Sequence, residues 1–273
     1  MIKNNNSFFG NLICFARKPF VSHLNKPRFL VVGAQKAGTT SLYRCLTSHP
    51  YIEPSYFPGE LHYFDLNFHK GDKWYATNFR SLKPKIITGE KSPYYLYHPL
   101  VPQRAHAYDS NLKIIVLLRN PVKRAYSHYI KELRNKNEHR TFREACAEGE
   151  AVVEIEHERL ANEEVAYSFA HQRWSYLARG KYIEQLDRWC RYFPREQIYI
   201  ETAERFINSP VEVCNDIFQF LGQELYLINS NKKHNQRQYE SMRSEDHAWL
   251  MEYYRQYNQK LSEEYHVDVS GWQ

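Results

Sequence analysis

Two glycines, a lysine and three hydroxyl side chains lie together in the segment GAQKAGTTS, from Gly33 to Ser41. The segment follows the short apolar run RFLVVG at 28–33 and precedes a stretch in which apolar residues have helical spacing. At such a strand-to-helix junction, the main-chain N–H groups and the positive end of the helix dipole attract anions. The sequence therefore predicts a phosphate site formed by Lys36, Ala37, Gly38, Thr39, Thr40 and Ser41.

The position of the lysine distinguishes this loop from a Walker A loop. The two glycines have the G-x-x-x-x-G spacing, but Thr39 stands where that motif has its lysine, and the lysine lies earlier, at Lys36. The apolar run KIIVLL at 113–118 ends in Arg119 and supplies no Walker B aspartate. Both features argue against a P-loop nucleotide kinase or NTPase, which is kept only as the alternative.

A second anion-binding pattern follows the apolar run 113–118, in the segment LRNPVKRAYS. Arg119 lies at the carboxyl end of the predicted strand, where α/β sheets bind their ligands, and Ser127 lies two helical turns further on. An arginine fork together with a hydroxyl group is suited to a phosphate. Together with the first loop, this pattern predicts a nucleotide that has two separate anionic groups.

These residues need a sheet to position them, and the sequence predicts one. Helices are predicted from 41 to a stop at Pro50, after Asn120-Pro121, through much of 141–192, from a capping box at 209–212 to Gly222, and at 244–265. Strands are predicted at 28–33, 85–88, 113–118 and 197–201. Strands separated by helices favour an α/β fold with a P-loop-like central parallel sheet flanked by helices, in a single domain. We assign 28–273 to this domain and 1–27 to an N-terminal leader.

Composition argues against several classes of protein, of which a non-enzymatic polyanion or nucleic-acid binder is kept as the third and last-ranked alternative. The chain has 273 residues with 37 Lys+Arg against 31 Asp+Glu, a net charge of +6, and no K/R-rich run. This modest charge does not favour a nucleic-acid or other polyanion-binding protein. No window approaches the roughly 20 apolar residues of a membrane span. The pair His157-Glu158 has Ala161 where a zinc motif needs its second histidine, so no metal is expected.

The five cysteines and the N-terminus suggest a location. The cysteines are widely spaced without a C-x-x-C pair, as expected of reduced thiols, and the first residues lack a signal-peptide pattern. We therefore expect a cytoplasmic protein. Residues 1–27 are interpreted as a flexible leader, with peripheral membrane contact through a weak surface helix as the alternative.

At this point the motifs resemble those of the sulfotransferases that use 3′-phosphoadenosine 5′-phosphosulfate (PAPS). GAQKAGTTSL is similar to their 5′-phosphosulfate loop and LLRNPVKRAYSHY to their 3′-phosphate element, R-x-P-x-x-R-x-x-S. The segments ELHYFD at 60–65 and GEKSPY at 89–94 resemble the glycan branch, the heparan-sulfate-type O-sulfotransferases. The resemblance covers roughly 28–270. It departs at 230–242, which lacks the paired cysteines and the K-G-R loop of the animal glycan enzymes.

The resemblance implies a reaction and a set of roles. The donor would be PAPS, without a metal, and Lys36 would neutralise charge on the leaving 5′-phosphate oxygen. On an extended segment Glu60 and His62 would share a face, so either could be the base. The family pattern favours Glu60, with His62 as its orienter. Lys91, His62 and Asp65 would bind the acceptor. That acceptor would be a saccharide or polysaccharide, with a lipid or phenol as the alternative.

Overall fold

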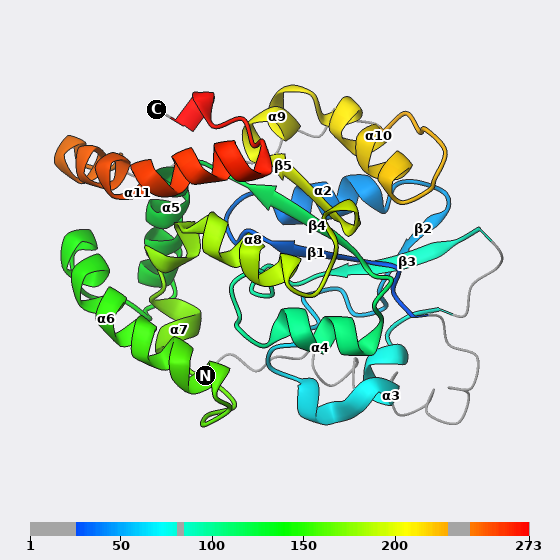
Figure 1. The fold of residues 1–273 in the computed structure, drawn as a ribbon, viewed down its shortest axis with the longest axis horizontal. Helices are drawn as coiled ribbons and strands as arrows, with labels where there is room; N and C mark the ends of the chain where they lie inside the picture. The colour runs from blue at the N-terminus through cyan, green and yellow to red at the C-terminus, as the bar shows by residue number, and fades with distance from the viewer. Residues whose placement is uncertain (1–25, 81–84, 229–240, 273) are drawn as a thin grey trace.

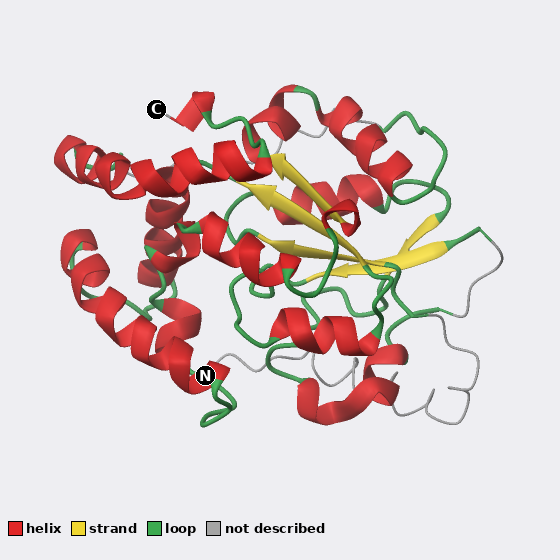
Figure 2. Cartoon of the chain, in the orientation of Figure 1, coloured by secondary structure: helices red, strands yellow, loops and turns green. Residues whose placement is uncertain are grey.

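The structure is a computed structural model that describes residues 26–80, 85–228 and 241–272. Most of the predicted leader, 1–25, and most of the 230–242 segment, up to residue 240, lie outside these described residues. Figure 2 shows a central sheet with helices around it. The strands are Phe29–Gly33 (β1), Ile52–Pro54 (β2), Ile87–Lys91 (β3), Lys113–Leu118 (β4) and Ile198–Thr202 (β5).

The helices follow the strands along the chain. The α-helices are Thr39–Leu46 (α2), Gly71–Ala76 (α3), Val101–Tyr108 (α4), Pro121–Arg134 (α5), Phe142–Ala161 (α6), Phe169–Arg173 (α7), Tyr182–Cys190 (α8), Ala203–Asn208 (α9), Pro210–Phe220 (α10) and Ser244–Tyr265 (α11). Short 3₁₀ helices cover Phe68–Lys70, Ala178–Gly180, Arg195–Gln197 and Ser270–Trp272. No helix of the described residues combines the length and the apolar character that crossing a membrane requires.

The sheet is parallel, with the strand order β2-β3-β1-β4-β5. Strands β1 and β4 are buried along almost their whole length, as expected of parallel strands covered on both faces. Helices α2 and α10 pack together on one side, and α4 and α8 lie on the other. The carboxyl ends of β1, β3 and β4 point toward α5, α6 and α11 (Figure 1). The predicted α/β class with a central parallel sheet is confirmed.

Two strand predictions can be compared with the structure in detail. The strand predicted at 113–118 is confirmed at both ends, whereas the one predicted at 85–88 lies at Ile87–Lys91. The prediction was displaced because Glu90, a charged residue, is fully buried within β3. Position 89 of β3 requires a glycine, because a Cβ there would come within 2.4 Å of the Phe29 ring on β1.

One helix boundary and one helix cap were predicted wrongly. Helix α2 ends at Leu46, well before Pro50, because Thr47 already leaves the helical conformation. The capping box predicted at Ser209 does not form: α10 begins at Pro210, but the Ser209 side chain makes no capping hydrogen bond. Its ψ of 61° differs from the extended backbone that capping requires. Thr141, with ψ of 161°, forms a capping box with Glu144 at the start of α6.

Candidate active site

The loop between β1 and α2 forms one wall of a cavity at the carboxyl edge of the sheet. Gly38 has φ of 100°, a conformation that glycine adopts without steric cost, and it leads directly into α2 at Thr39. Lys36 also has a positive φ, 74°. The loop therefore turns sharply and presents the N-terminus of α2 to the cavity.

This cavity, which we call the main cavity, has a volume of about 690 Å³. Its lining brings together residues that are distant in the sequence, from the β1–α2 loop, the end of β4, helix α5 and the segment before α3. All the predicted donor-site residues line it: Lys36, Ala37, Gly38, Thr39, Thr40, Ser41, Arg119 and Ser127. Glu60 lines the same cavity. Among the further lining residues, which the sequence did not single out, are Gln35, Lys131 and Arg134.

Asn120 fixes the orientation of α5 relative to β4. Its side-chain oxygen accepts hydrogen bonds from the backbone N–H groups of Val122 and Lys123, 2.9 and 3.1 Å away, and caps the helix. Because α5 starts immediately after β4, Arg119 at the strand end and Ser127 two turns into the helix face the same cavity. The predicted pair of anion-binding residues is thus held by a strand end and a capped helix.

Glu60, His62, Asp65 and Lys91 form one hydrogen-bonded chain. Lys91 Nζ donates to Glu60 Oε1 at 3.0 Å, and His62 Nε2 lies 3.1 Å from Glu60 Oε2. The other ring nitrogen, His62 Nδ1, lies 2.7 Å from Asp65 Oδ2. The expected extended segment is wrong at His62, whose φ is 49°. The chain turns there, and this turn places the ring between the two carboxylates.

The charges of these four hydrogen-bonded side chains oppose the effect of burial on the pKa values of Glu60 and His62. Burial alone would raise the pKa of Glu60, but the hydrogen bond from His62 and the charge of Lys91 outweigh it and lower the pKa to about 2. Burial alone would lower the pKa of His62, but Asp65 and Glu60 raise it to about 10. At neutral pH, Glu60 is therefore an ionised carboxylate and His62 an imidazolium.

Asp65 is placed behind the histidine. It is only 3% exposed, and its Oδ1 accepts a hydrogen bond of 2.6 Å from the backbone N–H of Leu66. Because its Oδ2 pairs with His62, both carboxylate oxygens are engaged within the protein. This arrangement favours a positioning role for Asp65, through His62, over direct contact with an acceptor.

A buried carboxyl group supports the turn at His62. Glu90 accepts hydrogen bonds from the hydroxyl groups of Tyr75 at 2.7 Å, Tyr95 at 2.9 Å and Ser92 at 2.9 Å. The Ser92 hydroxyl oxygen in turn accepts from the backbone N–H of His62 at 3.1 Å. Burial raises the pKa of Glu90 to about 7 even though these donors oppose the shift. The sequence reading missed this residue, although it lies within the quoted GEKSPY motif.

Arg179 is a second residue that the sequence reading did not single out, although it begins the segment RGKY. It is 2% exposed, and its Nη1 donates a hydrogen bond of 2.8 Å to Gln35 Oε1 in the β1–α2 loop. Its other donors bind Ser175 Oγ at 2.7 Å and the Gln172 carbonyl at 2.8 Å. Burial lowers the pKa of Arg179 to about 10, so the guanidinium is charged at neutral pH. Arg179 thereby anchors the loop that contains Lys36.

Metal-ligating side chains do not gather in the part of the chain that the structure describes: no group of three or more His, Cys, Asp or Glu residues could hold an ion. The cations that face the main cavity are side chains instead, Lys36, Arg119, Lys131 and Arg134. The arrangement can bind an anionic ligand along one wall and can accept a proton at Glu60.

Comparisons with known proteins identify the family. The family model of the sulfotransferase domain matches residues 26–269. The membrane-associated sulfotransferase kil1 of Dictyostelium discoideum is 29% identical over 86% of this chain and 64% of its own length. Human heparan sulfate glucosamine 3-O-sulfotransferase 6 is 32% identical over 72% of this chain and 52% of its own length. The chain thus spans less than two-thirds of the length of these relatives.

A solved structure of a sulfotransferase has a similar fold. The sulfotransferase from Alicyclobacillus acidocaldarius is 29% identical, with a TM-score of 0.75, over 91% of this chain and 99% of its own. The resemblance to sulfotransferases found in the sequence is confirmed, and the relatives include heparan sulfate enzymes, as the likeness to the glycan branch predicted. The chain belongs to the sulfotransferase family.

Proposed function

We propose that this protein transfers the sulfuryl group of PAPS to a hydroxyl group of a saccharide or polysaccharide acceptor. The observation that carries the proposal is the main cavity itself. Two cationic sites, one in the β1–α2 loop and one at Arg119 and Ser127, lie along its lining together with the carboxylate of Glu60. A donor with two separated anionic groups and an acceptor hydroxyl need this combination.

The residues of the β1–α2 loop fit the 5′ end of such a donor. Lys36 and the amides at the start of α2 would hold the 5′-phosphosulfate, whose S–O bond supplies the reactive group. Arg119 and Ser127 would hold the 3′-phosphate by charge-assisted hydrogen bonds. Lys36 stabilises the negative charge that develops on the 5′-phosphate oxygen, which is where a preorganised cation lowers a barrier. No metal is required for this role.

Glu60 is proposed as the general base. With a pKa of about 2 it is ionised throughout the neutral range, which is the state a base needs. The negative charge of a donor beside it would raise its proton affinity. His62 and Lys91 hold the two oxygens of Glu60 in place, so the carboxylate is oriented before the acceptor arrives.

Three observations support a saccharide acceptor. The ELHYFD segment, which is similar to the glycan enzymes, supplies Glu60 and His62, and one relative is named as acting on heparan sulfate glucosamine. Lys131 and Arg134 add positive charge to the main cavity beyond the donor residues, which suits an acidic acceptor. A lipid or phenol acceptor remains the alternative.

Mass spectrometry tests the proposal directly. The protein is incubated with PAPS and separate panels of heparan sulfate oligosaccharides, glycolipids and phenols, with Lys36→Ala as the inactive control. We expect a saccharide to gain one sulfuryl group without added magnesium and only with the unmodified protein. Preference for a phenol over every saccharide would overturn the acceptor class, and magnesium-dependent ATP turnover would restore the kinase or NTPase alternative.

A further inference from the structure

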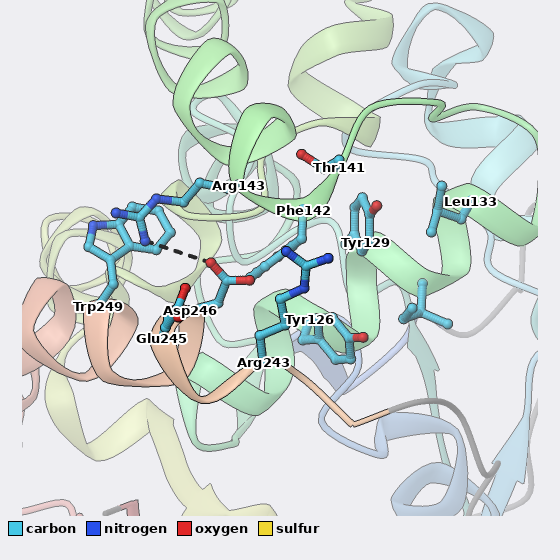
Figure 3. A pocket seen from close by; sticks show the side chains of 11 residues that line it. Tyr126, Tyr129, Leu133, Thr141, Phe142, Arg143, Arg243, Glu245, Asp246 and Trp249 are labelled. Atoms are coloured by element: carbon cyan, nitrogen blue, oxygen red, sulfur yellow. Dashed lines mark ion pairs between the residues drawn. The ribbon is translucent and has the colours of Figure 1, made fainter.

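A second cavity, of about 510 Å³, lies between α5, the start of α6 and the start of α11. Its volume is within the range of about 300–1,000 Å³ that is usual for small-ligand sites. Figure 3 shows side chains from all three helices turned toward one another around it. Neither the sequence motifs nor the proposed reaction assigns it a role.

Helix α5 separates this second cavity from the main cavity. Residues of α5 at helical spacing line the main cavity: Ser127, Ile130, Lys131 and Arg134. A set displaced by about one residue lines the second cavity: Tyr126, Tyr129, Ile130 and Leu133. Successive residues of a helix are about 100° apart, so the two sets lie on adjacent faces. Ile130 belongs to both, so the two cavities share a wall.

Aromatic and guanidinium groups dominate the second cavity. The Arg143 guanidinium lies 3.7 Å from the centre of the Trp249 ring and pairs with Asp246 at the same distance. Arg243 lines the same cavity, and in Figure 3 its guanidinium extends into the middle of the group of labelled side chains, between Asp246 and Phe142. The cavity therefore offers flat rings and planar N–H donors side by side.

Carboxylates complete the set of polar groups. Glu245 and Asp246 line the cavity with the two arginines, so hydrogen-bond acceptors and donors are balanced there. A sugar ring needs this mixture: its hydroxyl groups donate to carboxylates and accept from guanidinium groups, and its C–H face packs against aromatic rings. A phosphate group would be repelled by the two carboxylates, and a lipid chain would make no hydrogen bonds to the charged groups that line the cavity.

We propose that the second cavity binds a sugar unit of the acceptor chain, at a distance from the hydroxyl group that reacts beside Glu60. The inference rests on the proposed saccharide acceptor and adds a subsite to it. Because the second cavity and the main cavity share Ile130 as a wall, a chain of several units can reach both along the surface of α5. Short acceptors would reach only the main cavity.

Two variants test the subsite. Trp249→Leu removes the aromatic face, and Arg243→Gln removes the charge but keeps the length of the side chain. Phe169→Leu on α7 and Arg255→Gln, which changes an exposed arginine on α11, are matched controls outside the cavity. Affinities for a heparan sulfate disaccharide and octasaccharide are measured by calorimetry on the protein saturated with 3′-phosphoadenosine 5′-phosphate. This readout does not depend on turnover.

We expect each test variant to weaken octasaccharide binding by about tenfold, the usual effect of losing one good contact, and to leave the disaccharide unchanged. The kcat should be unchanged, while KM rises only for the octasaccharide. Equal losses for both lengths, or no loss relative to the controls, would overturn the subsite. If the unmodified protein sulfates saccharides but these variants match the controls, the subsite proposal is wrong and the proposed function stands. If the unmodified protein sulfates no saccharide, the proposed function is wrong, and the subsite proposal that rests on it is wrong as well.

Discussion

Arg119 Nη1 donates a hydrogen bond of 2.9 Å to the main-chain carbonyl of Lys36, a residue 83 positions earlier in the chain. The two predicted anion sites are therefore in direct contact. The bond also helps to hold Lys36 in its left-handed conformation, with φ of 74°. Arg119 has two tasks as a result: it faces the main cavity with part of its guanidinium and stabilises the loop with another part.

Replacement of Arg119 by alanine should weaken binding of 3′-phosphoadenosine 5′-phosphate by about ten- to a hundredfold, the loss expected for one charge-assisted contact. Adenosine 5′-phosphate lacks the 3′-phosphate, so its affinity should fall much less. Calorimetry with both nucleotides measures the difference. Equal losses would show that Arg119 acts only through the loop and not on the 3′-phosphate.

Replacement of Glu60 by glutamine keeps the shape of the side chain but removes the proton acceptor. Turnover should fall by about 10²–10⁴, while the affinity for 3′-phosphoadenosine 5′-phosphate stays nearly unchanged. Glu163→Gln, at an exposed carboxylate that pairs with Arg104, is the control. Should Glu60→Gln remain active while His62→Ala is inactive, the histidine is the base.

The pH dependence of kcat/KM provides an independent test of the base. Glu60 is ionised above its pKa of about 2, and His62 is protonated below its pKa of about 10. If Glu60 is the base and His62 acts as an imidazolium, kcat/KM should be level between these values and fall as pH approaches 10. A histidine base would instead make kcat/KM rise toward pH 10. If kcat/KM also changes near pH 7 and this change disappears in Glu90→Gln, the change comes from the titration of Glu90.

Glu90 should make the stability of the protein depend on pH. Its pKa rises from the ordinary value of 4.5 to about 7 in the folded state, so the folded state binds more protons than the unfolded state between these values. Its contribution to the free energy of unfolding is fully present below pH 4.5 and is lost as pH rises through 7. The loss should be about 3 kcal/mol. Urea unfolding between these pH values measures the free energy of unfolding of the unmodified protein and of Glu90→Gln. If the two free energies change in parallel with pH, the prediction is wrong.

The contact between Arg179 and Gln35 should be important for the β1–α2 loop. Arg179→Lys and Gln35→Leu each remove the hydrogen bond of 2.8 Å, so each should lower kcat and weaken donor binding. Arg179→Lys also alters the hydrogen bonds to Ser175 and Gln172, but both changes break the contact with each other, so the double variant should be little worse than Arg179→Lys alone. Strictly additive losses in this double-mutant cycle would show that the two residues act separately. Near-ultraviolet circular dichroism provides the check that Arg179→Lys is folded.

Local patterns in the sequence predicted the parts of the fold that depend on local physics. The run KIIVLL gave β4 without error because a continuously apolar segment has few alternatives in a covered parallel sheet. Asn120 and Pro121 gave the start of α5 because the cap and the fixed φ of proline act within a few residues. The residues of both anion sites likewise line one cavity, since carboxyl ends of parallel strands meet at one edge.

The features that the sequence did not predict depend on distant partners. A buried glutamate interrupted the apolar pattern of β3, and only the tyrosine hydroxyls around Glu90 explain why it is tolerated. Arg179 and Gln35 are 144 positions apart, so no spacing rule connects them. The Ser209 capping box had the right letters, but its formation depends on a backbone angle that the surrounding structure sets.

Strand β1 lies between β3 and β4, and this order affects how the protein could change over time. The loop after β1 lines the main cavity together with Glu60, Arg119 and residues of α5, while β1 itself pairs with β3 on one side and β4 on the other. Substitutions around 55–66 and after β3 can therefore alter what Glu60 meets without disturbing the pairing of β1 with β4. Under the proposed function, substitutions on the β3 side of β1 would change which acceptor the protein uses. The β4 side, which would bind the donor, would stay the same.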